Sequence, residues 1–453
     1  MPTSSDPVTD APPLARIPAW FQRWGPILPL LAAEFIVWLG FGGLLPVLPL
    51  YFYEQGLDLA TLGVVIAAWP AARLVSEPIF GWLADRTARV PLMVTGLLLT
   101  ALFSLLPLFL IGPGAFVLLR GAAGIAAAMY DPAARGYLTD ATPPERRGEA
   151  FGLYAAAQMG GLLIGPAIGA FGAGLFGGIA FVFVFSAVAS VIGAVGVALF
   201  VKEKGGRRTH PAPSHDATEF PRDAPSVQER AASDVDADRV PNADRVPNAD
   251  PNAPRRLWNR GLIAALVINA GGYYAGGTYE VIWSLFLQHL GAGLDLIGFT
   301  FAMFGLPVLL LSPFAGRIVD RRGSYLFIII GCLIPTFAGI AYTLIVDPLL
   351  AVPLILLEAT GFALLNPALY SVVAANSPIG RSSTAQGLFG AAGTVGFILA
   401  SLVAGVLADQ DIVYPFYVFS AVIFISLLIG LAIGGERLRL HQPVVPAAPA
   451  VPA

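Results

Sequence analysis

The chain has 453 residues, of which 56% are hydrophobic and only 12% are charged, and its formal net charge is −3. Such a composition excludes an ordinary soluble globular domain and indicates a membrane protein with several spans. With a single cysteine, Cys332, no intramolecular disulfide can form. With only four scattered histidines, we expect no metal site and no cofactor.

Twelve apolar runs follow in chain order, each long enough to cross a bilayer as a helix of about 20 residues. The first half contains runs at 27–52, 60–83, 90–111, 114–138, 150–172 and 178–201. The second half contains runs at 261–289, 295–316, 324–344, 348–374, 384–407 and 413–434. The runs are too long and too uniformly apolar for barrel strands, so we predict an all-α membrane protein with twelve transmembrane helices.

A polar segment divides the two groups of runs. Residues 203–260 are rich in Pro, Ala, Asp and Arg and contain a near-repeat that begins at Asp238, Asp244 and Asp250. Too few apolar residues are present to offset the entropy of ordering, so we predict a disordered linker, with a partner-binding segment as the alternative. The predicted organisation is an N-terminal tail (1–25), a helix bundle (26–202), the linker (203–260), a second bundle (261–435) and a C-terminal tail (436–453).

Basic residues lie on one side of the predicted spans. The termini, the linker and every second loop carry Arg or Lys, whereas the other loops carry acids such as Glu54, Asp58, Asp295 and Asp409 but no Lys or Arg. By the positive-inside rule, we expect both termini and the linker in the cytoplasm, and a multi-pass protein of the plasma membrane.

The two groups of runs share an irregular pattern at a fixed distance of 235 residues, from Pro78 to Pro313. Both copies read P-x-x-G-x-x-x-D-R, formed by Pro78, Gly81, Asp85 and Arg86 and by Pro313, Gly316, Asp320 and Arg321. The same offset joins further pairs, among them Gly42 and Gly277, Gly63 and Gly298, Pro132 and Pro367, and Gly161 and Gly396. A duplication of this kind is the build plan of many secondary transporters, and it predicts two pseudo-symmetric six-helix bundles.

Three motifs resemble those of the major facilitator superfamily, and the resemblance covers nearly the whole chain apart from the termini and the linker. Gly81-Trp-Leu-Ala-Asp85-Arg86-Thr-Ala-Arg89 resembles the signature loop between helices two and three, with Ala88 in place of a glycine. Arg120-Gly-Ala-Ala-Gly124 resembles a helix-four motif associated with proton handling. Gly161-Leu-Leu-Ile-Gly165-Pro166-Ala-Ile-Gly169-Ala170 resembles a helix-five motif that marks antiporters, with Ala170 in place of its last glycine.

The signature loop predicts a cytoplasmic latch. Asp85 lies at the C-terminal end of the second span, where the helix dipole disfavours an anion, so it needs a partner. Candidates are Arg86, Arg89, Arg135 or the N-terminus of a second-half helix. A contact that forms in one state and breaks in the other would involve Gly81, Asp85, Arg86 and Arg89, with Asp320 and Arg321 in the second copy. The alternative is a solvated loop charge that only sets orientation.

The helix-five motif predicts a hinge. Gly161, Gly165 and Gly169 recur every four residues and so line one face, which allows another backbone to approach closely. Pro166 removes a helical hydrogen bond and bends the helix. The alternative is ordinary packing of small residues.

Acids inside the spans are the main functional candidates, because each charge costs about 2.5–3.5 kcal/mol at the bilayer centre on insertion scales. Glu34 is our first candidate for proton coupling, and Asp131, Glu280 and Glu358 are the others. A buried carboxyl group can exchange protons near neutral pH. Glu280 and Glu358 could instead neutralise a cationic substrate.

Buried ion pairs are expected beside these acids. Arg73 and Glu77 are four residues apart on one face of a helix, and Glu34 and Arg73 both lie about 12 Å from the cytoplasmic face. A cluster of Glu34, Arg73 and Glu77 is therefore possible. Arg120 shares a face of the fourth span with Asp131. For each pair the alternative role is purely structural.

Aromatic residues lie where a substrate cavity could use them. The candidates are Phe35 and Trp38 in the first span and Tyr274, Tyr279 and Trp283 in the seventh. Such rings would suit lipophilic cations through stacking and cation–π attraction. The alternative is a position facing lipid or the membrane interface.

The resemblance implies a secondary active transporter, a proton-coupled antiporter that exports a small organic solute or drug in the manner of multidrug or sugar efflux permeases. It implies a monomer whose partners are the solute, protons and the lipid bilayer, without nucleic acid. The alternatives are a solute:proton symporter or facilitator on the same fold, and a non-transporting membrane sensor or assembly protein. The chain lacks a phosphate loop and a nucleophile–base set, so we do not expect an enzyme, and the substrate cannot be read from the sequence.

Overall fold

The computed structural model describes residues 20–21, 23–143, 146–176, 178–202, 256–378 and 381–438. Most of the predicted linker (203–255) and most of both predicted tails (1–19 and 439–453) lie outside the described residues.

The first predicted span consists of two helices, α2 (Leu28–Leu44) and α3 (Leu48–Glu54). Pro46 lies between them, and because proline has no backbone N–H it interrupts the helical hydrogen bonds. The other elements of the first half are α4 (Leu59–Ala84), α5 (Arg89–Leu105), η1 (Leu106–Leu108), α6 (Pro113–Ala141), α7 (Arg147–Leu175) and α8 (Ala180–Phe200).

The second half repeats this order. Its elements are α9 (Arg260–His289), α10 (Leu294–Arg322), α11 (Tyr325–Tyr342), η4 (Pro348–Leu350), α12 (Ala351–Ala375), α13 (Ser382–Ala408), α14 (Tyr414–Gly434) and η5 (Gly435–Leu438). Most boundaries lie within a few residues of the predicted spans. Helix α10 extends furthest beyond its predicted end, as far as Gly323, whose φ of 83° favours glycine and ends the helix.

Eleven of the described helical segments are long and apolar enough to cross a membrane. Helix α9 is not among them, although its 30 residues exceed the length of a span. Polar residues such as Asn269, Thr278 and Glu280 lower its hydropathy. Because the repeat pairs α9 with α2, we count it as the twelfth span, which agrees with the predicted fold class.

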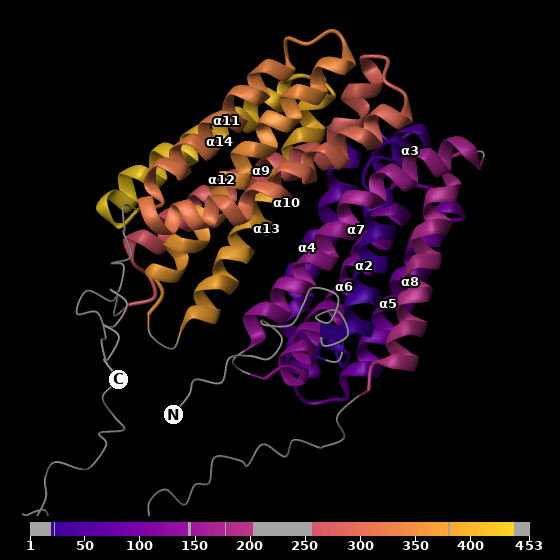
Figure 1. Cartoon of the computed structure of the whole chain (residues 1–453). Coiled ribbons are helices and arrows are strands. Elements are labelled where there is room, and N and C mark those ends of the chain that lie inside the picture. The colour runs from indigo at the N-terminus through magenta and orange to yellow at the C-terminus, as the bar shows by residue number, and fades with distance from the viewer. Residues whose placement is uncertain are drawn as a thin grey trace, which may run out of the picture. The chain divides into compact units, whose positions relative to one another are not determined.

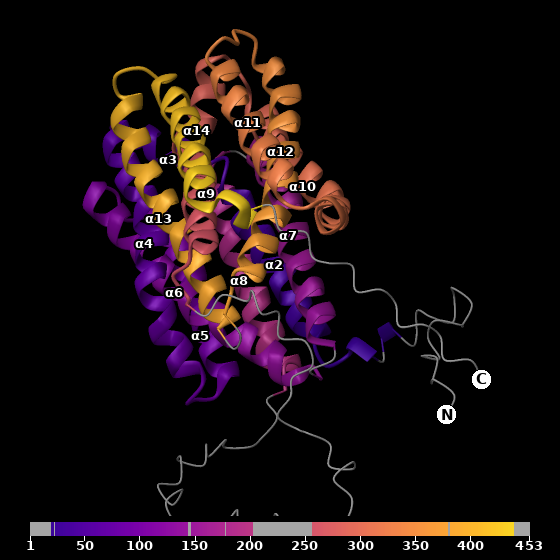
Figure 2. The same cartoon turned by 90° about the vertical axis from the view of Figure 1, so that its left-hand side faces the viewer.

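The helices of the first half, indigo to magenta, form one bundle, and those of the second half, orange to yellow, form another (Figures 1 and 2). Successive helices run in opposite directions because short loops join them. The loops after α4, α6, α10 and α12 therefore lie at one end, which we call the arginine-rich end. The loops after α3, η1, α7, α9, α11 and α13 lie at the opposite end.

The most extensive contacts between the bundles are those of α4 with α13 and of α7 with α10. A Cβ atom at Gly63 of α4 would lie only 2.3 Å from the Ser401 carbonyl oxygen of α13, and one at Gly298 of α10 only 2.8 Å from the Pro166 carbonyl oxygen of α7. Gly63 and Gly298 are equivalent positions of the sequence repeat. Each lies in the second turn of its helix, so these contacts are toward the opposite end.

Candidate functional site

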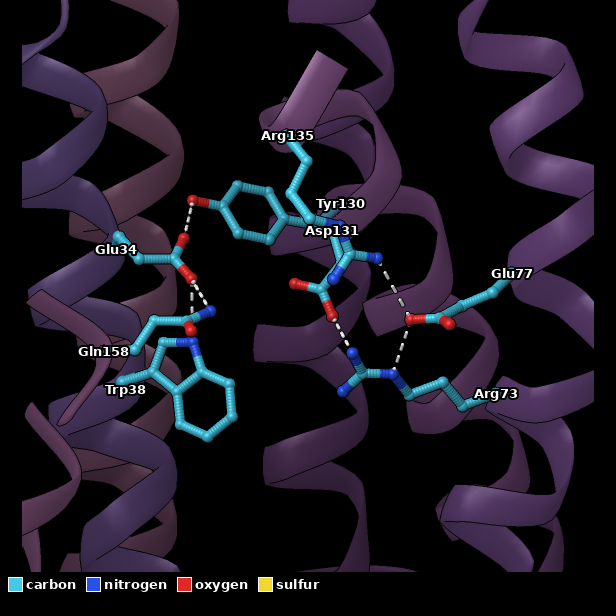
Figure 3. Close-up of polar contacts among 8 residues, drawn as sticks. All are labelled: Glu34, Trp38, Arg73, Glu77, Tyr130, Asp131, Arg135 and Gln158. Carbon is cyan, nitrogen blue, oxygen red and sulfur yellow. Dashed lines mark hydrogen bonds and ion pairs between the residues drawn. The ribbon is translucent and has the colours of Figure 1, made fainter. Parts of the chain in front are cut away.

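Glu34 is fully buried in a polar cluster of the first bundle (Figure 3). Its Oε1 atom accepts hydrogen bonds from Trp38 Nε1 at 2.8 Å and from Gln158 Nε2 at 2.6 Å. Its Oε2 atom accepts a hydrogen bond from the Tyr130 hydroxyl at 2.5 Å. These donors come from α2, α7 and α6 and are all uncharged, so neutral groups position this carboxyl.

Arg73 of α4 is the centre of an ionic cluster beside Glu34. Its guanidinium forms an ion pair with Asp131 of α6, and its Nε atom lies 2.9 Å from Glu77 Oε1. Arg135 of α6 extends the cluster, because its Nη2 atom lies 3.5 Å from the same Glu77 oxygen. Asp131 directly follows Tyr130, so α6 connects the ionic cluster to Glu34 (Figure 3).

The structure separates two groups that the sequence prediction joined. The predicted contact between Arg73 and Glu77 is present, but no hydrogen bond or ion pair of the described residues joins Arg73 to Glu34. Asp131 occupies that place (Figure 3). The rotation of α2 turns Glu34 toward α6 and α7 rather than toward α4.

Arg120 joins the two bundles. Its Nη2 atom lies 2.9 Å from Glu280 Oε1 on α9, and both side chains are largely buried. Although Arg120 and Asp131 share a face of α6, they bind different partners, because eleven residues span about 16 Å of helix. The Trp69 ring of α4 lies between the arginines, 5.1 Å from Arg73 Cζ and 5.9 Å from Arg120 Cζ. No sequence motif singled out Trp69.

Glu358 is a second fully buried acid, located in the second bundle. Its Oε2 atom accepts hydrogen bonds from the hydroxyls of Tyr279 at 2.5 Å and Tyr342 at 2.8 Å. Its Oε1 atom has no hydrogen-bond partner among the described residues. This carboxyl therefore also has neutral donors alone within the described part of the chain.

The predicted aromatic residues lie in different surroundings. Tyr279 and Trp283 pack against the rings of Tyr342 and Phe416, and Trp283 donates a hydrogen bond to Thr300 Oγ1 at 2.9 Å. Both are part of a packed aromatic group in the second bundle.

The remaining predicted rings also differ in their contacts. Phe35 lies against Gly160 of α7, and Tyr274 is buried in the second bundle. Trp38 binds Glu34 and contacts Phe41, which in turn stacks on Trp69 with ring centroids 5.5 Å apart. Trp38, Phe41 and Trp69 therefore form a row of rings from Glu34 to the arginines.

The signature loop makes its contacts within the first half. Arg89 Nη2 lies 3.7 Å from Asp85 Oδ1, but Arg89 also binds Asp140 of α6 at 2.5 Å, and the Asp85 side chain is 70% exposed. Arg86 stacks on Trp82 at 4.1 Å. No hydrogen bond or ion pair of the described residues joins Asp85 to the second half. In the second copy of the motif, Arg321 is exposed, and the side chain of Asp320 lies outside the described part.

The glycine face of α7 packs on α2. A Cβ atom at Gly161, Gly165 or Gly169 would lie 2.4 Å, 2.5 Å or 2.6 Å from a backbone carbonyl oxygen of α2. The other side of α7 contacts α10 through Pro166, which lies inside a continuous helix. Helix α7 thus links Glu34 in the first bundle to the contact between the bundles.

At the opposite end, Asp409 closes the contact between α13 and α4. Its carboxylate accepts hydrogen bonds from the backbone N–H groups of Leu59 at 3.0 Å and Ala60 at 3.2 Å. The N-terminus of a helix attracts a carboxylate through its dipole. Asp58 caps the same helix, and the hydrogen bond from the Thr61 backbone N–H lowers the pKa of Asp58. In the sequence, Asp409 was recognisable only as an acidic loop residue.

These features define a class of protein. Two similar helix bundles that meet toward one end, with buried acids between the helices, are the architecture of a secondary transporter. Among the described residues, no group of three His, Cys, Asp or Glu side chains could hold a metal ion.

Known proteins identify the family. A family model of the Major Facilitator Superfamily matches residues 30–357 and 272–449. Over 407 residues the chain is 26% identical to Multidrug resistance protein 2 of Bacillus subtilis (strain 168), which covers 88% of this chain and 92% of that protein. It is also 32% identical to Quinolone resistance protein NorA of Staphylococcus aureus (strain MRSA252) over 139 residues. That match covers 30% of this chain and 35% of NorA.

The fold is also similar to solved structures. The crystal structure of peptide transporter POT in complex with sulfate matches with a TM-score of 0.68 at 16% identity, over 92% of this chain and 96% of that chain. The protein therefore belongs to the Major Facilitator Superfamily and is a multi-pass membrane transporter, not an enzyme. The predicted family, fold class and transporter class are confirmed.

Proposed function

We propose that the protein exchanges protons for a small organic solute and exports that solute across the plasma membrane. In this proposal the arginine-rich end faces the cytoplasm, as the positive-inside rule requires, and one chain is the transporting unit. The name of the relative that spans most of the chain, a multidrug resistance protein, supports drug-like compounds as the exported solutes.

The surroundings of Glu34 are the observation that carries this proposal. An ionised carboxyl without a neighbouring cation is costly to bury, and the hydrogen-bond donors to Glu34 are neutral. The half-buried Arg73 and the buried Arg120 are bound to acids of their own. Glu34 can therefore be neutralised by a proton or by a cationic group of a solute, but not by both at once. Mutually exclusive binding of this kind is the chemical basis of antiport.

The row of rings beside Glu34 favours an aromatic or lipophilic organic cation. Trp38, Phe41 and Trp69 would provide stacking and cation–π attraction next to the carboxyl. The predicted acids Glu280 and Glu358 then have different roles, Glu280 in the contact between the bundles and Glu358 within the second bundle.

The contacts between the bundles support alternating access. Three kinds of contact between the bundles lie toward the opposite end. They are the close backbone contacts at Gly63 and Gly298, the ion pair of Arg120 with Glu280, and the hydrogen bonds that Asp409 accepts from α4. With that end outside the cell, these contacts close the external side. In the other state they would break, and we propose that Asp85 then binds the second half as the predicted latch.

Everted membrane vesicles containing a pH-sensitive dye test the proposal. A panel of cationic, neutral and anionic organic solutes is added after an inward proton gradient has formed, and recovery of the dye signal reports proton release. We expect recovery with lipophilic cations in the wild type and no solute-dependent recovery in Glu34→Gln.

The control is Glu54→Gln, the same substitution at an exposed acid at the end of α3. It should behave as the wild type. Solute-dependent proton release that survives in Glu34→Gln would contradict the assignment of Glu34, and recovery in the absence of any proton gradient would contradict antiport.

A further inference from the structure

We propose that Tyr154 carries the proton between the Glu34 carboxyl and the arginine-rich end of the first bundle. The inference rests on the proposed function, because antiport requires a path by which Glu34 gains and loses its proton. Tyr154 belongs to none of the motifs recognised in the sequence.

Tyr154 lies where such a path would begin. It precedes Gln158 by four residues on α7, so it is on the same face and about 6 Å closer to the arginine-rich end. The side chain is 4% exposed, and its hydroxyl makes no hydrogen bond of good geometry among the described residues, although it lies within reach of the Glu34 carboxyl. A buried hydroxyl without a well-formed hydrogen bond costs about 1–3 kcal/mol. Its position beside Glu34 and Asp131, with which it interacts electrostatically, therefore suggests a role other than packing.

The hydrogen bonds of Glu34 place the exchangeable proton on its Oε2 atom. Trp38 Nε1 and Gln158 Nε2 both donate to Oε1, so that atom already faces two N–H groups. A proton bound to Glu34 is therefore on Oε2, where the Tyr130 hydroxyl lies at 2.5 Å. Tyrosine hydroxyls accept and donate hydrogen bonds, so they can pass a proton on.

The two tyrosines differ in depth. Tyr130 is eleven residues before the end of α6 at Ala141, about 16 Å from the arginine-rich end, whereas Tyr154 is seven residues after the start of α7 at Arg147, about 10 Å from it. Tyr154 is thus the hydroxyl on the side from which cytoplasmic water would reach Glu34.

The proposed transfer leaves no charge on the tyrosine. The proton on the Glu34 carboxyl moves to the Tyr154 oxygen while the hydroxyl proton of Tyr154 moves to a water molecule at the arginine-rich end. Glu34 becomes ionised, Tyr154 is neutral again, and the water becomes hydronium. The reverse transfer protonates Glu34.

The charged groups around this path belong to the helices already described. Asp131 and Arg135 of α6 interact with Tyr154, and so does Arg73 of α4. Helix α8, which also packs on α2, contains no titratable residue. Arg73 is bound to Asp131 and Glu77, whereas the Tyr154 hydroxyl is neutral and unpaired with any of these charges.

The sequence repeat links Tyr154 to Glu34. At a distance of 235 residues, Asn269 takes the place of Glu34 and Phe389 the place of Tyr154. Asn269 Nδ2 donates a hydrogen bond to the Phe389 carbonyl oxygen at 2.7 Å, so the equivalent position holds a fixed structural contact. The carboxyl and the hydroxyl therefore occur together in one half and are absent together from the other.

Time-resolved infrared spectroscopy after a pH jump tests the inference on the purified full-length protein without a solute. The carboxyl band that disappears in Glu34→Gln reports protonation of Glu34. We expect Tyr154→Phe to slow the change of this band by about 10²-fold, the lower end of the range for a positioned proton-transfer group. Tyr137→Phe is the matched control, because the Tyr137 hydroxyl binds the Pro26 and Lys202 carbonyl oxygens, and it should keep the wild-type rate.

A wild-type rate in Tyr154→Phe would overturn the inference, and so would equal slowing in Tyr137→Phe or a Glu34 band that does not titrate. The vesicle assay separates this result from failure of the proposed function. Loss of coupling in Glu34→Gln together with a wild-type infrared rate in Tyr154→Phe overturns the relay alone. Coupling that persists in Glu34→Gln overturns the proposed function.

Discussion

Replacing Gly63 with alanine should force the two bundles apart at the opposite end. A methyl group there would lie 2.3 Å from the Ser401 carbonyl oxygen. That is about 1.2 Å inside the ~3.5 Å at which non-bonded heavy atoms make favourable contact. Because the obstructing atom belongs to the backbone of α13, no side-chain rotation can relieve the overlap, and the helices must separate.

The Gly63→Ala substitution should raise the free energy of the state described here. Overpacking of one methyl group typically costs about 1–3 kcal/mol, which corresponds to a shift of roughly 5–150-fold in a two-state equilibrium. If the bundles alternate as proposed, the shift favours the state that is open at the opposite end and closed at the arginine-rich end.

Spin-label distances in proteoliposomes measure this shift. Labels at the exposed positions Thr87, after α4, and Thr384, near the start of α13, report the separation of the arginine-rich ends. We expect the population with short distances to increase in Gly63→Ala by the factor above. Chromatography and thermal unfolding would verify that the variant is folded.

The matched control is Gly196→Ala in α8, where a Cβ atom would meet nothing within 4 Å. It adds the same methyl group without an overlap and should leave the distances unchanged. If Gly63→Ala gives the wild-type distance distribution while folded, or if Gly196→Ala shifts it equally, the reasoning from this contact is refuted.

Two further predictions concern contacts between the bundles. Asp409→Asn removes a charge from the N-terminus of α4 and should destabilise the same state by about 0.3–1 kcal/mol. The populations of the spin-label distances should therefore change in the same direction as in Gly63→Ala, but by less. A larger change than in Gly63→Ala would contradict this prediction. Glu280→Ala leaves Arg120 buried without its partner and should lower the stability in detergent by about 3–5 kcal/mol. Arg120→Met combined with Glu280→Met should recover most of that loss in thermal unfolding, and a double variant no more stable than Glu280→Ala would contradict the ion pair.

The sequence predicted buried residues better than their partners. Glu34 was recognisable as a buried acid because it lies inside an apolar run, but its donors Tyr130 and Gln158 are far away in the chain. Arg73 and Glu77 were predictable as a pair, because four residues make about one helical turn. Asp131 completes the ionic cluster only because α6 packs beside α4.

Some features had no signal in the sequence beyond residue type. Trp69 and Tyr154 are ordinary aromatic residues of transmembrane helices, and only their neighbours distinguish them. Asp409 resembles the other acids of its side of the membrane, yet its carboxylate binds a helix of the other half. The repeat could have indicated Tyr154, since Phe389 replaces it where Asn269 replaces Glu34.

The sequence by itself determined the spans, the duplication and the family, because apolar length and repeated motifs are properties of the chain that do not depend on how helices pack. Only the tertiary structure decided which buried charges are paired, which end of the bundles is closed and that Glu34 is held by neutral donors. Those properties depend on the rotation of each helix about its own axis, which is set by packing against residues distant in the chain.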